Sequence, residues 1–583
     1  MDSAARRLLL ALSILMLLAG CALGPAKRAQ VDARLAQAHA VSTDCRPGVD
    51  CQPADSPLHA LMDADDGRHR VLILNRGADA LRLRLHLIGA ARHSIDVQTF
   101  IFQDEASTEL LLRELLHAAR RGVRVRVLVD QLFSFNQVDR LAQLALAHRN
   151  FHLRFFNPTF REARTQAWEY VASGLCCFRR FNQRMHNKLF AVDGRLAIIG
   201  GRNYRDSYYD LNPTFAYYDR ELLVLGPATA DMNASFERFW RNRHASPVAH
   251  LADVGRALLR GDEQDGALVK LPPDDSLLAA RLRALLADAG DLELLLERFV
   301  APLREVARLR FVADLPSKIG SRKPEANASS LAIRELLAGA DEEVLLQTPY
   351  LVLDRATRRL FKQHHQDNPQ MRVRVSTNSL AATDAYPVYA LSYKYKKRYL
   401  RELGFMIYEM RPDPAHWPEL IEAADPAQPP RVSLHGKSAV VDRHIALVGT
   451  HNFDPRSDRF NTEAAVIIDD AGFAAELARL IERDMEPANS WVVAPKERGI
   501  APVYWMSRAL ENISSALPVF DLWPFRYASS FQHLADCPPL AREHPDFYRC
   551  YRDVGDFPGV DSLLARIRAR LVAAFGAPMV PIL

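Results

Sequence analysis

The sequence repeats itself at long range, and this duplication constrains the fold more than any other feature. The segment at 185–203, MHNKLFAVDGRLAIIGGRN, recurs in outline at 434–452 as LHGKSAVVDRHIALVGTHN. Both copies contain His-x-Lys-x4-Asp with an Asn 17 positions after the His, and the two histidines are 249 positions apart. Segments 95–102 and 123–130 also have counterparts near this distance. We therefore predict two halves with the same fold.

Each half shows the same order of expected elements. Opening strands are expected at 71–74 and 309–313, where apolar residues cluster. An amphipathic helix is expected at 107–121, because its apolar residues recur at helical spacing, and Gly122 marks its end. A Val-rich strand follows at 123–130. Strands that alternate with helices favour an α/β fold in which each half has a central, largely buried sheet.

The chain is also too long for one hydrophobic core. It has 583 residues, whereas single cores stop growing at roughly 250–300 residues. We predict a signal peptide at 1–20, a polar and irregular tether at 21–67, a first domain at 68–246, a helical connector at 247–304, a second domain at 305–485 and a C-terminal extension at 486–583. Apolar groups at 504–505 and 520–525 favour packing of the extension against the body over a membrane-surface element.

The N-terminus has the plan of a secretory signal peptide. Arg6 and Arg7 precede an apolar run at 8–18, which is shorter than the ~20 residues that span a bilayer. The run ends in Leu-Ala-Gly-Cys21, which resembles a bacterial lipobox, in which the Cys is acylated. An ordinary cleaved signal or an uncleaved anchor is the alternative. The residue after Cys21 is Ala22 rather than Asp, and in this respect the chain resembles Gram-negative lipoproteins of the outer membrane. We therefore expect a lipid-anchored protein on the periplasmic face of the cell envelope, at the outer membrane.

Cysteine usage agrees with export. Apart from Cys21, six cysteines remain, and an oxidising compartment permits disulfides between neighbours in the sequence. Cys45 with Cys51 and Cys537 with Cys550 are the candidate pairs, and the alternative is that some or all stay reduced. No Cys/His spacing is typical of a zinc site.

The repeated motif has the residue types that a phosphodiester-cleaving site needs. Residues i and i+2 of a strand share a face, so His186 with Lys188, and His435 with Lys437, are expected to point together. One histidine can attack phosphorus while the other gives a proton to the leaving oxygen. A phosphohistidine intermediate would divide the displacement into two steps, and the second step can use water or an alcohol.

The lysines and two asparagines complete this site. Lys188, Lys437, Asn203 and Asn452 can together neutralise the non-bridging phosphate oxygens as charge shifts in the transition state. With these groups around one phosphate, we expect neither a metal ion nor another cofactor.

The two motifs resemble the HKD motifs of the phospholipase D superfamily, and the resemblance covers roughly residues 68–483. It implies two duplicated α/β domains, each with a mixed sheet flanked by helices, and an active site at their pseudo-twofold interface. It also implies that His186 is the nucleophile and His435 the general acid, although the order could be reversed. Asp193 and Asp442 would buttress the motifs rather than touch substrate. Because one chain carries both motifs, no oligomer is required.

An acid is expected to hold each imidazole by its other nitrogen. Glu463 is the candidate that resembles the family pattern, 28 positions after His435. Its counterpart would be Glu221, 35 positions after His186, and Asp219 could take its place.

Within the superfamily, the chain is most similar to bacterial cardiolipin synthases and their lipoprotein-like relatives. The stretches 189–201 and 377–384 carry this resemblance. It implies transfer of a phosphatidyl group from phosphatidylglycerol to a second headgroup alcohol, on an anionic phospholipid surface reached through the lipid anchor. The N-terminus departs from typical cardiolipin synthases, which have membrane-spanning helices there. The alternatives are hydrolysis to phosphatidic acid, an exported nuclease, and a catalytically silent scaffold.

Charge helps to choose among these alternatives. The net charge of +5 is too small to indicate a nucleic-acid binder by itself, so no obligatory nucleic acid is expected. Local basic clusters at 179–184 and 394–398 could attract anionic headgroups, although a solvated helix face explains the lysines equally well.

Overall fold

A computed structural model describes residues 23–46, 51–64, 66–261, 268–319, 324–496 and 527–575. The expected signal peptide, Cys21 and the apolar groups at 504–505 and 520–525 lie outside these ranges. None of the helices within them has the length and apolar character to cross a bilayer.

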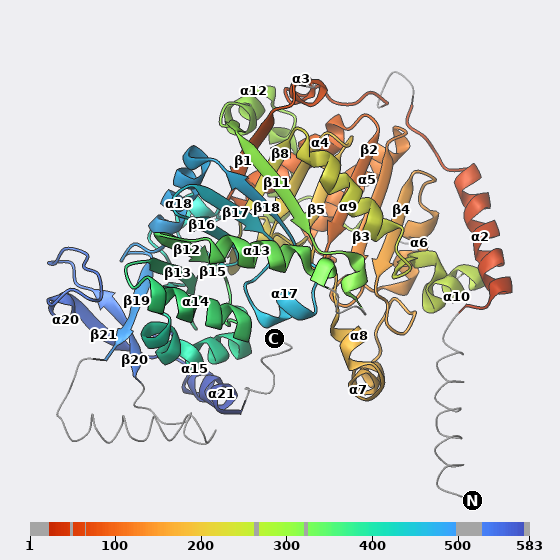
Figure 1. Cartoon of the computed structure of the whole chain (residues 1–583). Helices are drawn as coiled ribbons and strands as arrows, with labels where there is room; N and C mark the ends of the chain where they lie inside the picture. Colours follow the sequence, from red (N-terminus) through yellow and green to blue (C-terminus); the bar gives the residue numbers. More distant parts are fainter. Residues whose placement is uncertain are drawn as a thin grey trace, which may run out of the picture.

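Each half is built on a large mixed sheet (Figure 1). Within the described residues, the first sheet contains, in spatial order, β10 (Arg304–Val306), β1 (His69–Leu74), β8 (Glu221–Leu225), β6 (Leu196–Gly200), β5 (Leu189–Val192), β2 (Ser94–Thr99), β3 (Arg124–Asp130), β4 (Phe151–Phe156) and β9 (Ala245–Pro247). The second contains β11 (Arg308–Ala313), β18 (Ala464–Asp469), β17 (Ile445–Gly449), β16 (Ser438–Val441), β12 (Glu343–Gln347), β13 (Arg372–Asn378), β14 (Met406–Met410), β19 (Ser490–Pro495), β20 (Ala528–His533) and β21 (Tyr551–Gly555).

The two sheets have the same topology. From β1 to β9 and from β11 to β19 the strands follow one another in matching order and matching direction. In both, three parallel strands (β2, β3, β4 and β12, β13, β14) adjoin an antiparallel set that carries the motif hairpin. The predicted duplication of an α/β fold is therefore confirmed.

In both halves a helix joins each successive pair among the first four strands. The described helices of the first half are α4 (Gly77–Ala90), α5 (Ala106–Arg120), α6 (Val138–Leu146), α7 (Ala167–Cys176), α8 (Phe178–Asn182) and α9 (Ala228–Trp240). Those of the second half include α13 (Ala328–Ala338), α14 (Arg355–Asp367), α15 (Tyr386–Glu402), α16 (Trp417–Leu420), α17 (Pro455–Arg459) and α18 (Ala471–Asp484). The amphipathic helix expected at 107–121 is α5, which begins with a capping box between Glu105 and Thr108.

A shared hydrophobic core joins the halves. It contains Phe236 and Phe239 of α9, Phe473 and Leu477 of α18, and apolar residues of β6, β8, β17 and β18. At its edge, β7 (Phe215–Tyr218) of the first half pairs in parallel with β15 (Arg431–Leu434) of the second. The halves are thus held as one body, with the motif hairpins facing the junction.

The segment expected to be an irregular tether is instead partly helical, and this prediction was wrong. It forms α2 (Pro25–Ala40) and α3 (His59–Asp63). α2 contacts α6 and α10 (Ala252–Arg260), and its Val31 is fully buried. Alanine-rich sequence has high helix propensity, but α2 buries so few apolar residues that its helical pattern is weak.

The connector and the extension also contribute strands. Between the halves, the expected helices appear as α10, α11 (Leu277–Asp288) and α12 (Leu292–Leu295), and β10 then joins the first sheet. The second sheet continues beyond the boundary expected at 485, because β19 pairs with β14 and is followed in the sheet by β20 and β21. Two short elements, α20 (Phe547–Cys550) and α21 (Leu563–Phe575), complete the described extension.

Disulfides join Cys45 to Cys51 and Cys537 to Cys550, the two pairs that the sequence permits. A third disulfide joins the adjacent Cys176 and Cys177, at the junction of α7 and α8.

Candidate active site

The two motif histidines precede strands rather than lying within them. β5 begins at Leu189 and β16 at Ser438, so each His-x-Lys segment is the extended chain that leads into a strand. Each histidine is fixed by a backbone hydrogen bond to the other half: His186 N–H donates to the Thr462 carbonyl (3.0 Å) and His435 N–H to the Tyr218 carbonyl (2.7 Å). The junction between the halves therefore positions both imidazoles.

The acid that holds each imidazole also comes from the other half. His186 Nδ1 lies 2.8 Å from Glu463 Oε2, and His435 Nδ1 lies 2.5 Å from Asp219 Oδ2. Both carboxylates are completely buried, and both histidines are 6% exposed. The two halves thus exchange their acids across the pseudo-twofold axis.

The prediction that Glu221 orients a histidine was wrong. Its carboxylate pairs with the buried guanidinium groups of Arg84 and Arg202. The strand register explains the error: Gly200 lies opposite Glu221, whereas Gly449 lies opposite Ala465. Two positions earlier on each strand are Asp219 and Glu463, so these two residues are structural counterparts although their side chains differ.

A glycine makes room for the Asp219 carboxylate. A Cβ atom placed on Gly201 would stand 2.2 Å from Asp219 Oδ1. The counterpart of Gly201 is Thr450, whose hydroxyl donates to Glu463 Oε2. Gly201 therefore permits the close approach of the Asp219 carboxylate, which any side chain at this position would block.

Burial and charge fix the protonation of the histidines. Burial, with a further contribution from Lys188, lowers the pKa of His186 to about 4 against the opposing effect of Glu463. Burial and Lys437 likewise lower the pKa of His435 against the effect of Asp219. In spite of burial, His186 holds the pKa of Glu463 down to about 2. A neutral imidazole whose Nδ1–H donates a hydrogen bond to an ionised carboxylate presents an unprotonated Nε2, which is the form that attacks phosphorus.

Both motif lysines are buried beside these pairs. Lys188 Nζ donates to the His186 carbonyl (2.8 Å), and Lys437 Nζ donates to the His435 carbonyl. Burial lowers the pKa of Lys188 to about 7 and that of Lys437 to about 8, against the attraction of Glu463 and Asp219 respectively. Lys437 Nζ also lies 2.6 Å from His435 Nδ1, where it competes with Asp219. We assign the Nδ1 proton to the bond with Asp219, because the ionised carboxylate can only accept a hydrogen bond whereas the Lys437 ammonium can only donate one.

The two asparagines differ in how they are held. Asn203 accepts a hydrogen bond from the Ile101 N–H (3.2 Å) and donates to the Tyr208 hydroxyl (3.0 Å), which lies 3.4 Å from His435 Nε2. Asn452 is 7% exposed, and its Oδ1 is buried without a hydrogen-bond partner among the described residues. The side-chain oxygen of Asn452 thus lacks the partner among the described residues that Asn203 has in the Ile101 N–H.

Asp193 and Asp442 are structural, as the resemblance implies. Both occupy the left-handed region, with φ of 52° and 49°. Asp193 accepts the backbone N–H groups of residues 92–94, and Asp442 accepts those of residues 341–343, at 2.7–2.9 Å. Each carboxylate ties the turn of the motif hairpin to the start of the neighbouring strand.

The basic clusters are more buried than their sequence indicates. Arg184 is fully buried and bonds Asp130, whose carboxylate also accepts the Met185 N–H. Lys396 is 4% exposed and pairs with Glu409 at 2.7 Å. These two side chains are therefore committed to buried ion pairs rather than exposed on the surface.

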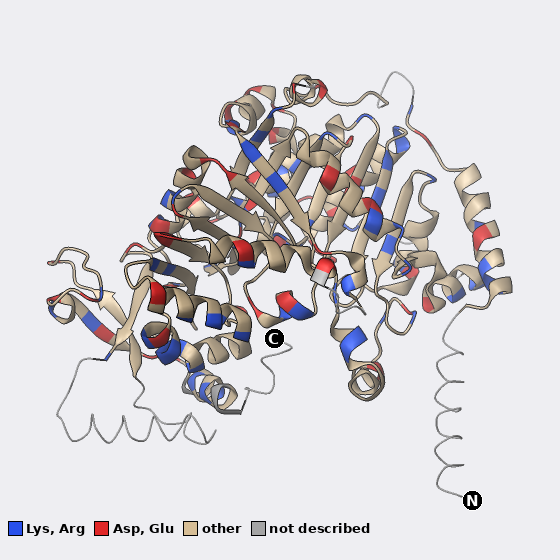
Figure 2. Cartoon of the chain, viewed as in Figure 1, with Lys and Arg blue, Asp and Glu red and all other residues tan. Residues whose placement is uncertain are grey.

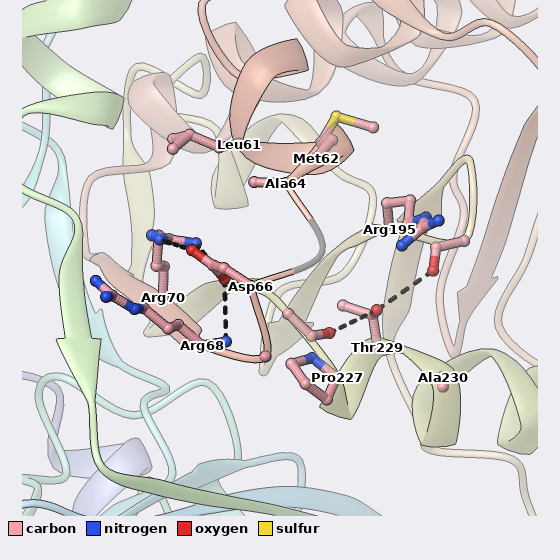
Figure 3. Close-up of a pocket in the computed structure, with 13 residues that line it drawn as sticks. Leu61, Met62, Ala64, Asp66, Arg68, Arg70, Arg195, Pro227, Thr229 and Ala230 are labelled. Carbon is pink, nitrogen blue, oxygen red and sulfur yellow. Dashed lines mark hydrogen bonds and ion pairs between the residues drawn. The ribbon is translucent and has the colours of Figure 1, made fainter.

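One surface pocket lies beside the turn that joins β5 to β6, at the end of this hairpin that is farther from His186 and Lys188 (Figure 3). Asp66 and Arg70 form an ion pair in its wall, and Gly194 and Thr229 line it as well. It contains no motif residue. Within the described ranges, no group of three or more His, Cys, Asp or Glu side chains is arranged to hold a metal ion.

Comparison with known proteins agrees with this geometry. The family model for the cardiolipin synthase, PLD-like domain matches residues 85–240 and 333–485. A Helicobacter pylori (strain J99) protein described as uncharacterized is 32% identical over 72% of this chain and 80% of its own length. Cardiolipin synthase C of Escherichia coli K12 is 30% identical over 73% of this chain and 86% of its own length. Phosphatidylserine synthase of Haemophilus influenzae aligns over 78% of this chain and 97% of its own, with 14% identity and a TM-score of 0.49. The chain belongs to the cardiolipin synthase type of the phospholipase D superfamily.

Proposed function

We propose that the protein is a phosphatidyltransferase that uses phosphatidylglycerol and a second headgroup alcohol to form cardiolipin. The observation that carries the proposal is the pair of histidine–carboxylate bonds exchanged between the halves, with a lysine beside each. Membership in the cardiolipin synthase type of the superfamily supports a phospholipid as the substrate.

The reaction proceeds in two balanced steps. His186 Nε2 attacks phosphorus, the bond from phosphorus to the headgroup oxygen breaks, and His435 Nε2–H gives its proton to that oxygen. The negative charge of the bound phosphodiester raises the pKa of His435 and of both lysines, which puts the proton in place. The acceptor hydroxyl then gives its proton to His435 and attacks phosphorus, and the phosphorus–nitrogen bond breaks. Lys188, Lys437 and Asn452 stabilise the non-bridging oxygens throughout.

A protruding apolar element supports a lipid substrate over a nucleic acid. α7 and α8 project from the body (Figure 1), and their exposed residues include Trp168 (56%), Val171 (71%) and Leu175 (88%). α8 ends only four residues before His186. Figure 2 shows Lys and Arg interspersed with Asp and Glu over both halves rather than gathered in one stripe, whereas single-stranded nucleic acid binds a continuous basic groove.

We extend the proposal to location. The signal-peptide plan and Cys21 support a lipid anchor on the periplasmic face of the envelope, which would hold the site near anionic phospholipids. Labelling with a radioactive fatty acid, compared between wild type and Cys21→Ser, tests the anchor. Equal labelling of both proteins would overturn it.

Labelled phosphatidylglycerol in vesicles tests the reaction, with single-stranded DNA as a separate substrate. We expect cardiolipin, with phosphatidic acid as a minor product, and His186→Ala should reduce turnover by several orders of magnitude. Trapped phosphoenzyme should be lost in His186→Ala and retained in His435→Ala. If phosphatidic acid is the only product, the reaction is hydrolysis rather than transfer. Cleaved DNA with intact lipid would refute the proposal.

A further inference from the structure

The two ends of the active site differ in polarity, although the halves share one fold. Beside His186, the Phe100 ring lies 5.0 Å from the imidazole, edge to face, and Phe133 lies 5.2 Å from Phe100. Phe133 is 45% exposed, so this end opens through apolar surface. Beside His435, the rings of Tyr208 and Tyr217 lie 5.3 Å and 5.1 Å from the imidazole. One end is therefore lined by phenylalanine and the other by tyrosine.

A carboxylate stands among the tyrosines. Tyr217 donates its hydroxyl hydrogen to Asp384 Oδ2 (2.9 Å), and Tyr350 donates to Asp384 Oδ1 (2.9 Å). Tyr217 belongs to the first half, whereas Tyr350 and Asp384 belong to the second, so the cluster spans the junction. Burial lowers the pKa of His435 and of Lys437, and the negative charge of Asp384 opposes this lowering at both groups. The carboxylate therefore lies in the electrostatic field of the site.

Asp384 retains capacity for a ligand. It is exposed, and among the described residues it forms no ion pair. The nearby guanidinium of Arg431 instead donates to the Ala381 carbonyl (2.7 Å). Burial and Asp384 raise the pKa of Tyr217 and of Tyr350, so both phenols stay protonated and act as donors. An ionised carboxylate has about four lone-pair sites, of which the two phenols leave some free.

We propose that Asp384, oriented by Tyr217 and Tyr350, is the binding site for the alcohol that leaves in the first step and enters in the second. It would accept hydrogen bonds from a second donor group on that alcohol, either the hydroxyls of glycerol or the ammonium of ethanolamine. It would repel an alcohol that carries a carboxylate in place of this second donor group, as glycerate does. This inference rests on the proposed function and specifies its acceptor class.

The position of Asp384 beside His435 also indicates which histidine is the nucleophile. In an in-line displacement the leaving oxygen departs opposite the attacking nitrogen. An alcohol held by Asp384 leaves beside His435, so His186 is the nucleophile. The lipid portion then lies toward Phe100 and Phe133, on the side from which α7 and α8 lead into the motif.

Partitioning of the phosphoenzyme tests the subsite. Wild type and Asp384→Asn receive the same phosphatidyl donor and equimolar mixtures of glycerol with 1-propanol, ethanolamine with 1-propanol, and glycerate with glycerol. The product ratio does not depend on the amount of folded enzyme or on the rate of the first step. Glu402→Gln is the matched control, because this exposed carboxylate at the end of α15 pairs only with Arg398 in the described structure.

We expect Asp384→Asn to reduce the preference for glycerol over 1-propanol by about tenfold, since a hydrogen bond to a charged group is worth that much or more. The ethanolamine mixture shows whether hydroxyl or ammonium is preferred. Transfer to glycerate should rise relative to glycerol, and Glu402→Gln should change no ratio. If Asp384→Asn and Asp384→Ala alter the rate but leave every ratio unchanged, the cluster is structural and the subsite is refuted while phosphatidyl transfer stands. If wild type transfers to no alcohol, the proposed function and the subsite fail together.

Discussion

At the scale of single residues, the site depends on carboxylates that neutralise buried imidazoles. Asp219 and Glu221 are two positions apart on one chain, yet the first holds His435 and the second holds Arg84 and Arg202. Because Asp219 and Glu221 contact different partners, substitutions at these two positions should have different consequences.

Asp219→Asn should reduce kcat by about 10³–10⁴-fold, because the amide neither fixes the imidazole tautomer nor stabilises the imidazolium. Glu221→Gln should instead lower stability, by about 3–5 kcal/mol, because it leaves buried guanidinium groups without their counter-charge. Turnover per trapped phosphoenzyme and thermal unfolding separate the two effects. An equal loss of kcat in folded Glu221→Gln would contradict this division.

The two motif lysines should determine how kcat/KM falls at alkaline pH. Burial lowers the pKa of Lys188 to about 7 and of Lys437 to about 8, so the free enzyme loses positive charge as pH rises through this range. Phosphodiester binding should therefore weaken, and kcat/KM should fall, between about pH 7 and 9. The bound phosphodiester raises both pKa values, so kcat should fall only at higher pH. Coincident limbs for kcat and kcat/KM would show that the lysines stay charged in the free enzyme.

The sequence predicted these residues unevenly, for a physical reason. His186, Lys188, Asp193 and Asn203 follow from local spacing that both copies share. Asp219 depends on which residues lie opposite one another in the ladder of β6 and β8, and a match of Glu to Glu selects the wrong strand position. The tyrosines around Asp384 have no counterpart in the other copy of the repeat, so a comparison of the two copies does not indicate them.

At the scale of elements, α7 and α8 are the most exposed apolar part of the first half. Tyr170 and Phe181 pack edge to face at 5.5 Å, which holds the two helices together while Val171 and Leu175 remain in solvent. Burial of such side chains in a bilayer would stabilise docking by about 1.5–3 kcal/mol each.

Val171→Glu and Leu175→Glu should each reduce activity on vesicles by at least tenfold. Activity on a short-chain phospholipid below its critical micelle concentration should be retained, because neither side chain touches the motif. Leu277→Glu is the control, since Leu277 is 90% exposed on α11, a different helix. Equal activity of α7 variants and control on vesicles would refute membrane docking through α7.

Element prediction failed where packing, rather than local pattern, decides structure. α2 and β19 were assigned to a tether and to an extension, but each is fixed by contacts with distant elements, α10 and β14. The α/β order of the halves, in contrast, was predictable because α5 and the buried strands have strong local periodicity.

At the scale of the whole molecule, one chain provides every group of the site. The shared core and the β7–β15 pair hold the halves in register, and each half provides one motif and one acid for the other motif. The repeat predicted two similar halves, but not this exchange, which depends on the faces that meet.

A mixture of His186→Ala and His435→Ala chains tests this arrangement. If each chain forms its own site, every site lacks one histidine and the mixture should be as inactive as either variant. The measurement is cardiolipin formation after co-refolding or co-expression of the two chains. Recovery toward a quarter of wild-type activity would indicate sites shared between chains.

Because each half supplies the acid for the other half's histidine, activity depends on correct docking of the two halves. A half that folds but docks wrongly presents a buried carboxylate without its imidazole and an imidazole without its carboxylate, and neither arrangement can form a phosphohistidine and resolve it. Catalysis therefore requires that the two halves have docked, because each half supplies the carboxylate that the histidine of the other half needs. A newly synthesised chain would remain inert toward phosphodiesters until both halves had met.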